Sequence, residues 1–139
     1  MVVPNAFLGP ISHFWCVHVM SVQGNLTSEK ASRAMFDHVT SRWGARILMG
    51  LQDGTHRFNE LRRLIGGVSD KMLSQTLQVL EEDGLVDRSV SPHSPPRVEY
   101  ALSPMGREVA LHLKTLTDWI EANADRADRE KRTRVVTSR

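Results

Sequence analysis

The stretch Ser69–Gly106, "SDKMLSQTLQVLEEDGLVDRSVSPHSPPRVEYALSPMG", limits the possible folds more than any other part of the chain. Its first part predicts a helix that runs from a cap at Ser69 to about Asp83. Three leucines recur there at helical spacing and would share the side that faces a core: Leu73, Leu77 and Leu80. A helix therefore opens this stretch.

The rest of the stretch predicts an antiparallel hairpin. After Gly84, the runs "LVDRSV" and "RVEYAL" are typical of short strands. The second run alternates along one face through Val98, Tyr100 and Leu102. The intervening "SPHSPP" cannot continue a strand ladder, because its prolines lack the N–H donor, and it predicts a turn or loop.

Helical patterns flank this stretch on both sides. The predicted helices span Ser28–His38, Arg42–Leu51, Asn59–Ile65 and, after the hairpin, about Pro104–Ala124. Their expected boundary signals are Thr27 or Ser28 as the first cap, Asp53-Gly54, Gly66-Gly67, and Ser103 followed by Pro104. The whole order is four helices, two strands and a helix. This order predicts a mainly α protein with a small β hairpin, a winged helix-turn-helix.

The predicted helix that begins at Ser69 carries polar groups suited to DNA on the side opposite its leucines. These are Lys71, Ser74, Gln75 and Gln78. Glutamine can pair with adenine edges, lysine with guanine or phosphate, and serine with either. An ordinary solvated amphipathic helix would show the same pattern, and the hairpin that follows favours the DNA-binding interpretation.

The chain resembles the HxlR-type transcriptional regulators, which are related to the MarR winged-helix regulators. The resemblance runs from about Ser28 to Trp119 and is carried by the blocks "RFNELRR", "SDKMLSQ", "EDGLV" and "PPRVEY". It implies a homodimer that binds double-stranded operator DNA through the helix beginning at Ser69 and the wing. The expected DNA-binding residues are Arg62, Arg63, Ser69, Lys71, Met72, Ser74, Gln75, Gln78, His93 and Arg97.

The sequence also departs from the family pattern. Thr76 and Gln78 stand where members often carry arginines, so an operator sequence does not transfer from relatives. Many members sense oxidants through a cysteine about a dozen residues before the tryptophan that corresponds to Trp43. That count reaches Lys30, and the single thiol, Cys16, lies further upstream, so a thiol switch of the family type is not expected.

An apolar surface predicts the dimer, which we expect the first and last helices to form. The expected interface residues are Met35, Val109, Leu113, Leu116, Trp119 and Ile120, and Ala31 and Ala34 would add to the first helix. Trp119 with its neighbours could instead line an effector pocket, and the effector is unknown. A winged helix used for protein association is the alternative to DNA binding.

The remaining features set the expected class and boundaries. No nucleophile–base pair or phosphate-binding glycine loop supports an enzyme, and no cofactor is expected. His13, Cys16 and His18 lie close in sequence, but a metal site needs more ligands than this segment supplies. One cysteine and no apolar membrane-spanning run favour a cytoplasmic protein, and the DNA binding that the resemblance implies would associate it with the nucleoid.

Both ends of the chain are expected to lie outside the folded domain. Residues 1–27 are predicted to be a poorly ordered extension, unless translation begins at Met20, and 28–124 the winged domain. Residues 125–139 are predicted to form a basic tail, because Arg126–Arg139 holds six Lys or Arg against two acidic residues.

Overall fold

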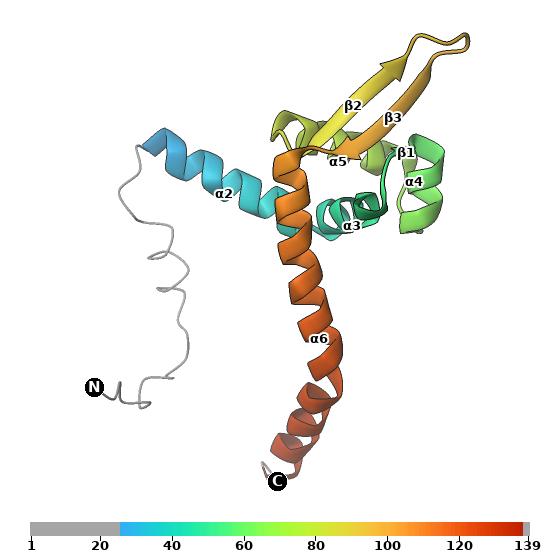
Figure 1. Cartoon of the computed structure of the whole chain (residues 1–139). Helices are drawn as coiled ribbons and strands as arrows, with labels where there is room; N and C mark the ends of the chain where they lie inside the picture. Colours follow the sequence, from blue (N-terminus) through green and yellow to red (C-terminus); the bar gives the residue numbers. More distant parts are fainter. Residues whose placement is uncertain (1–25, 138–139) are drawn as a thin grey trace. The chain divides into compact units, whose positions relative to one another are not determined.

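A computed structural model describes residues 26–137 (Figure 1). The elements are α2 (Leu26–Thr40), α3 (Arg42–Gly50), a 3-10 turn (Leu51–Asp53), β1 (His56–Arg57), α4 (Phe58–Ile65), α5 (Asp70–Glu82), β2 (Val86–Ser91), β3 (Arg97–Leu102) and α6 (Pro104–Thr137). The chain divides after Asp37 into two units, and the second unit, from His38 onward, contains the winged helix. The predicted extension lies outside the described residues except for residues 26 and 27, which belong to α2.

The core of the winged domain is built from leucine, isoleucine and valine side chains that the helices and the sheet contribute in turn. Ile47 and Leu48 of α3, Leu61 of α4, and Leu73, Leu77 and Leu80 of α5 have at most 1% of their surface exposed. Leu85 and Val86 cover this core from the start of the hairpin. Burying a side chain of this size contributes about 1.5–3 kcal/mol each, so these contacts dominate the stability of the helical arrangement.

Hydroxyl caps fix where three of the helices begin. Ser41 accepts a hydrogen bond from the Gly44 N–H at 3.1 Å, and Ser69 accepts one from the Met72 N–H at 3.1 Å. Ser103 accepts from the Gly106 N–H at 2.9 Å and donates to the Gly84 carbonyl at 2.6 Å. The predicted caps at Ser69 and Ser103 are therefore confirmed, and Ser103 also ties the start of α6 to the turn between α5 and β2.

The sheet has three strands in the order β1-β3-β2, all antiparallel. The predicted hairpin is confirmed, with Val90 opposite Val98 near the turn (Figure 1). The sequence did not predict β1, where Arg57 pairs with Glu99. Two residues are too few to give the alternation that identifies a strand, and β1 exists because β3 offers a free edge.

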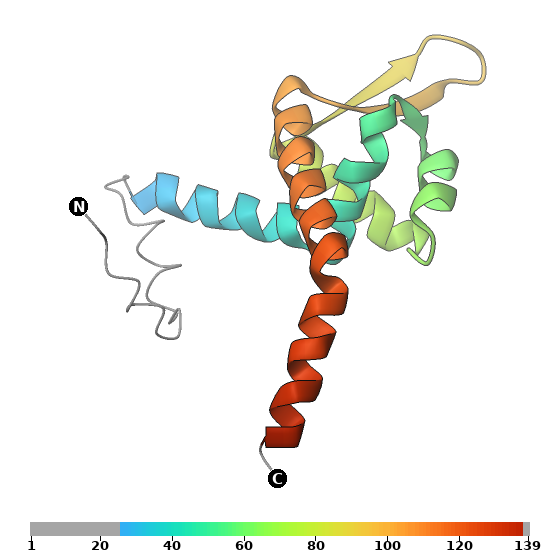
Figure 2. The ribbon, with the colours of Figure 1, turned by 60° about the horizontal axis from the view of Figure 1, so that its bottom comes forward.

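The last helix continues much further than its apolar stripe predicts. It ends at Thr137 instead of near Ala124, so residues 125–137 of the predicted basic tail are helical. Ion pairs four residues apart join Arg126 to Glu130 at 3.2 Å and Asp128 to Arg132 at 2.9 Å. Such pairs support an exposed helix without any buried side, and a helix of this kind has no apolar periodicity in its sequence. Figure 2 shows α6 continuing well beyond the other elements of the domain.

The first described helix also differs from its prediction at both ends. It spans Leu26–Thr40 instead of Ser28–His38. Within it, Glu29 and Arg33 approach to 3.7 Å as a helical ion pair. At its end, His38 Nδ1 lies 2.7 Å from an Asp83 carboxylate oxygen, at the last turn of α5. None of the described helices is both long enough and apolar enough to cross a membrane.

Candidate nucleic-acid interface

Helix α5 separates its core side from an outward polar side, as predicted. Leu73, Leu77 and Leu80 are buried, whereas Lys71, Ser74, Gln75 and Gln78 are exposed. Met72 is 42% exposed beside them. The outward side thus presents one cation, one hydroxyl and two amides to solvent, the groups that can read base edges in a major groove.

Several predicted DNA-binding side chains already have partners within the chain. Ser69 caps α5, and the Gln78 amide donates to a Glu82 carboxylate oxygen at 3.2 Å. The Arg63 guanidinium donates to the Asn59 carbonyl at 3.3 Å. Among the described residues, the side chains on the outward side of α5 that make no such contact are those of Lys71, Ser74 and Gln75.

The turn between α4 and α5 is held by an ion pair. Arg62 Nη1 lies 2.7 Å from the Asp70 carboxylate, and both side chains are largely exposed. Gly66 and Gly67 have φ values of 65° and 72°, which a side chain would disfavour. The pair therefore joins the end of α4 to the first turn of α5.

The wing brings two further predicted residues to the protein surface. His93, in the loop, and Arg97, at the start of β3, are both exposed. Beneath the loop, a cleft of about 470 Å³ separates the wing from the beginning of α4. Wing and helix-turn-helix therefore share a cleft that the sequence did not predict.

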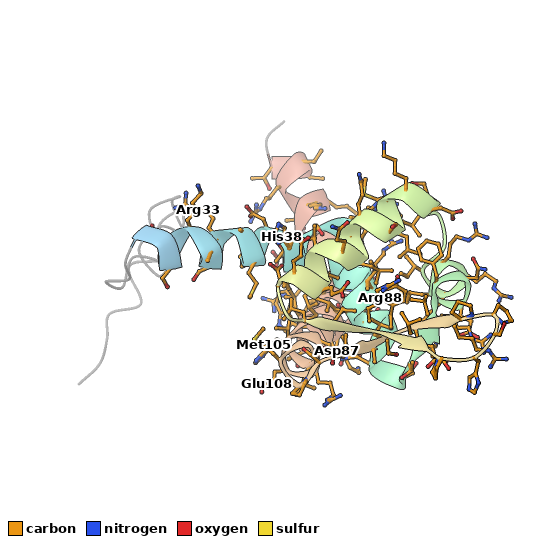
Figure 3. All side chains as sticks on the ribbon, turned by 90° about the horizontal axis from the view of Figure 1, so that it is seen from above. Arg33, His38, Asp87, Arg88, Met105 and Glu108 are labelled. Carbon is orange, nitrogen blue, oxygen red and sulfur yellow. The ribbon has the colours of Figure 1, made fainter. Side chains whose placement is uncertain are left out.

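Two more arginines lie on the sheet in positions that sequence reasoning missed. Arg57 lines the cleft from β1, and no pattern in the sequence could place it before β1 was recognised. Arg88 lies on β2 opposite Tyr100, and Figure 3 shows Asp87 and Arg88 pointing to opposite sides of the strand. Side chains two residues apart in a strand lie on the same side, so the apolar Val86, which is buried, could have indicated the side of β2 on which Arg88 lies.

A cationic cluster on α3 was also missed. The guanidinium carbons of Arg42 and Arg46 lie 4.7 Å and 5.5 Å from the centre of the Trp43 ring. Spacings of one and three residues around a tryptophan on a helix were the available signal. Cation–π stacking restrains both guanidinium groups at the start of α3.

The Glu60 carboxylate is engaged by the backbone at the start of α4. Glu60 accepts a hydrogen bond from the Arg57 backbone N–H at 2.9 Å. That hydrogen bond is the main cause of a lowered pKa of Glu60, desolvation opposes it, and the charges of Arg57, His56 and Arg63 lower the pKa further by smaller amounts. The ionised form of the carboxylate is therefore favoured chiefly by the hydrogen bond from the Arg57 backbone.

The predicted dimer residues divide into two groups by exposure. Val109 and Leu113 are half-buried on α6, and Thr117 beside them donates to the Met49 sulfur at 3.4 Å. Leu116, Trp119 and Ile120 are 54%, 63% and 51% exposed. Met35 on α2 is half-buried. The inner part of the α6 stripe thus faces α3 of its own chain, and the outer part faces solvent.

Between residues 26 and 137, no three His, Cys, Asp or Glu side chains gather in a way that could hold a metal ion. The segment with His13, Cys16 and His18 lies outside the described residues, so its interpretation stays a prediction.

Comparison with known proteins identifies the family. The HxlR-like helix-turn-helix model matches residues 38–128. Over 102 residues, the chain is 55% identical to the HTH-type transcriptional regulator YtfH of Escherichia coli K12, covering 73% of this chain and 81% of the relative.

Solved structures agree with this assignment. The transcriptional regulator YtfH from Salmonella typhimurium matches with a TM-score of 0.69 at 50% identity, over 79% of this chain and 99% of that one. A MarR-family regulator from Enterococcus faecalis V583 matches with a TM-score of 0.62 at 30% identity, over 78% and 97% of the two chains. The winged helix described above is the fold of these regulators, and this chain belongs to the HxlR-like helix-turn-helix family of transcriptional regulators.

Proposed function

We propose that the protein is a sequence-specific regulator that binds an inverted-repeat operator as a homodimer. The observation that carries this proposal is the outward side of α5, where Lys71, Ser74 and Gln75 are exposed directly opposite a fully buried leucine stripe. A helix held in this way by its core can enter a major groove with its polar side toward the bases. The wing, with His93 and Arg97 exposed, would contact the flanking backbone.

We infer a dimer because one recognition helix contacts too short a stretch of DNA. A single recognition helix contacts only a few base pairs, too few to specify one site in a genome. A two-fold dimer doubles the site and places equivalent helices about 34 Å apart, one turn of DNA. The exposed side chains of Leu116, Trp119 and Ile120 supply an apolar surface for it, and Met35 would add to it from α2.

The mechanism we infer is steric: a dimer on a promoter operator blocks or redirects polymerase. Such a protein acts in the cytoplasm at the nucleoid, needs no cofactor and performs no catalysis. The test is a footprint of the purified protein on the DNA upstream of its own gene, with affinity measured as a function of salt. We expect two protected half-sites one turn apart and an affinity that falls steeply with salt.

A winged helix that associates with another protein is the alternative. It would give no footprint, and any residual DNA binding would be equal on operator and random sequences. The family assignment and the cationic residues at the turn and wing, Arg63, Lys71 and Arg97, favour DNA. An operator footprint that is absent at low salt would refute the proposal.

A further inference from the structure

The cleft beneath the wing is built from two parts of the chain far apart in sequence. Arg57, Phe58 and Asn59 form one wall, and residues 93–98 of the wing form the other. β1 brings these walls together by pairing with β3. The cleft has a volume of about 470 Å³, which lies within the range of small-ligand sites. It is therefore large enough for a phosphate with its attached sugar.

Two guanidinium groups can reach one ligand in this cleft. Arg57 lies opposite Glu99, and Arg97 is two residues from Glu99 on the same face of β3. Side chains in this diagonal relation lie about 7–8 Å apart, within reach of two long arginines that converge on one anion. Planar guanidinium donors match the geometry of phosphate oxygens better than any other side chain does.

The charges around the cleft favour an anion. None of the described residues that line it is acidic, and Asn59, His93 and Ser94 add hydrogen-bonding groups to the two arginines. Glu99 lies directly opposite Arg57, on the same face of β3 as Arg97, but neither Glu99 nor Glu60 lines the cleft, and Glu60 is engaged by the Arg57 backbone N–H. Within residues 26–137, no ion pair joins Arg57 or Arg97 to an acidic side chain. Both guanidinium groups are therefore available to a ligand.

We propose that this wing cleft is a phosphate-binding site in which Arg57 and Arg97 together hold one phosphate group. The phosphate comes either from the backbone of bound DNA or from a free phosphate ester. In the first case, which rests on the proposed function, the wing and the start of α4 close on the same phosphate and fix the angle at which α5 enters the groove. In the second, the occupied cleft would exclude that backbone contact.

The first experiment tests the cleft without DNA. Inorganic phosphate is titrated into the full-length protein while the amide signals of Asn59 and His93 are followed by NMR. We expect saturable shifts in the wild type and affinity lower by about tenfold or more in Arg57→Gln and in Arg97→Gln, since each removes a charge-assisted contact. Arg129→Gln, an exposed arginine on α6 far along the chain, is the matched control and should behave as wild type.

The second experiment measures binding of the same proteins to a duplex of random sequence over a range of salt. If the phosphate belongs to DNA, each cleft variant lowers the salt slope by about one ion. The double variant should then lose less affinity than the product of the two single losses, because both arginines hold one group. An unchanged DNA slope with saturable phosphate binding assigns the cleft to a free phosphate ester.

Different results would contradict the cleft assignment and the proposed function. Unchanged slopes together with no saturable phosphate shift, or equal effects of Arg129→Gln, would overturn the cleft assignment while operator binding stands. A wild-type protein that binds no DNA would overturn the proposed function, and the phosphate titration would still decide the cleft. Unchanged thermal melting curves of the variants exclude misfolding as the cause.

Discussion

Gln75 is the residue whose side chain tests base readout most directly. It is exposed on the outward side of α5, and its amide has no partner among the described side chains, unlike Gln78, which is bonded to Glu82. A glutamine that pairs with an adenine edge contributes about 1–3 kcal/mol of discrimination. We expect Gln75→Ala to weaken operator binding by about that amount in a gel-shift titration and to leave binding to random DNA almost unchanged.

The matched control for this change is Gln52→Ala, another exposed glutamine outside the interface. It should leave both affinities unchanged. Equal losses on operator and random DNA for Gln75→Ala would assign Gln75 to the backbone instead of the bases.

A second residue-scale prediction concerns Glu60 and pH. Its pKa is lowered chiefly by the hydrogen bond from the Arg57 N–H, so the ionised carboxylate is favoured in the folded state. A group whose pKa is depressed by folding stabilises the protein above its unfolded pKa and loses that contribution as pH falls through the folded pKa. We expect wild-type stability to decrease more between pH 6 and 3 than that of Glu60→Gln, as measured by urea midpoints.

Because Glu60 is exposed, solvent screens its charge interactions and the difference between the two proteins should be small. Parallel curves for wild type and Glu60→Gln over this pH range would contradict the stabilising role assigned to the hydrogen bond between Glu60 and the Arg57 N–H.

At the scale of elements, regular patterns long enough to repeat were predictable, and features set by tertiary contact were not. The leucine period gave α5 and its outward side, and the proline-rich turn gave the hairpin. β1 is two residues long and exists only through pairing with β3, so the sequence carries no signal for it. Without β1, neither Arg57 nor the wing cleft could be placed beforehand.

Gly106 gives an element-scale prediction about how α6 packs on the hairpin. A Cβ there would overlap the Leu85 carbonyl oxygen, because the first turns of α6 press directly against the chain after α5. We expect Gly106→Ala to destabilise the protein by about 1–3 kcal/mol, the usual cost of overpacking, despite the better helix propensity of alanine. Chemical denaturation measures this change.

Gly50→Ala is the control, since its nearest neighbour is the end of the flexible Leu64 side chain at 3.2 Å. It should be tolerated much better. If Gly106→Ala were as stable as wild type, the close approach of α6 to Leu85 would be in doubt.

At the scale of the whole molecule, the apolar side of α6 has more surface than one chain covers. Gly106, Ala110 and the half-buried Leu113 face their own domain, where α6 packs along α3. The next turns leave Leu116, Trp119 and Ile120 exposed to solvent, and apolar side chains grouped in this way predict an association surface. A sequence stripe contains both groups without distinguishing them, which is why the predicted interface combined residues that pack on the chain's own domain with residues exposed to solvent.

The resulting prediction is a constitutive homodimer, and replacing Leu116 and Ile120 together with Asp should abolish it. Burying four carboxylates at a two-fold interface, two from each chain, would cost far more than the apolar contacts contribute, so the variant should be monomeric in light scattering. It should still bind a single half-site weakly, because α5 and the wing are unchanged, but should no longer protect both halves of the operator.

Replacing Leu111, which is exposed on another part of α6, with Asp is the matched control and should stay dimeric. A wild-type protein that scatters as a soluble monomer at micromolar concentration would contradict this prediction, and a Leu111→Asp monomer would move the interface to a different side of α6.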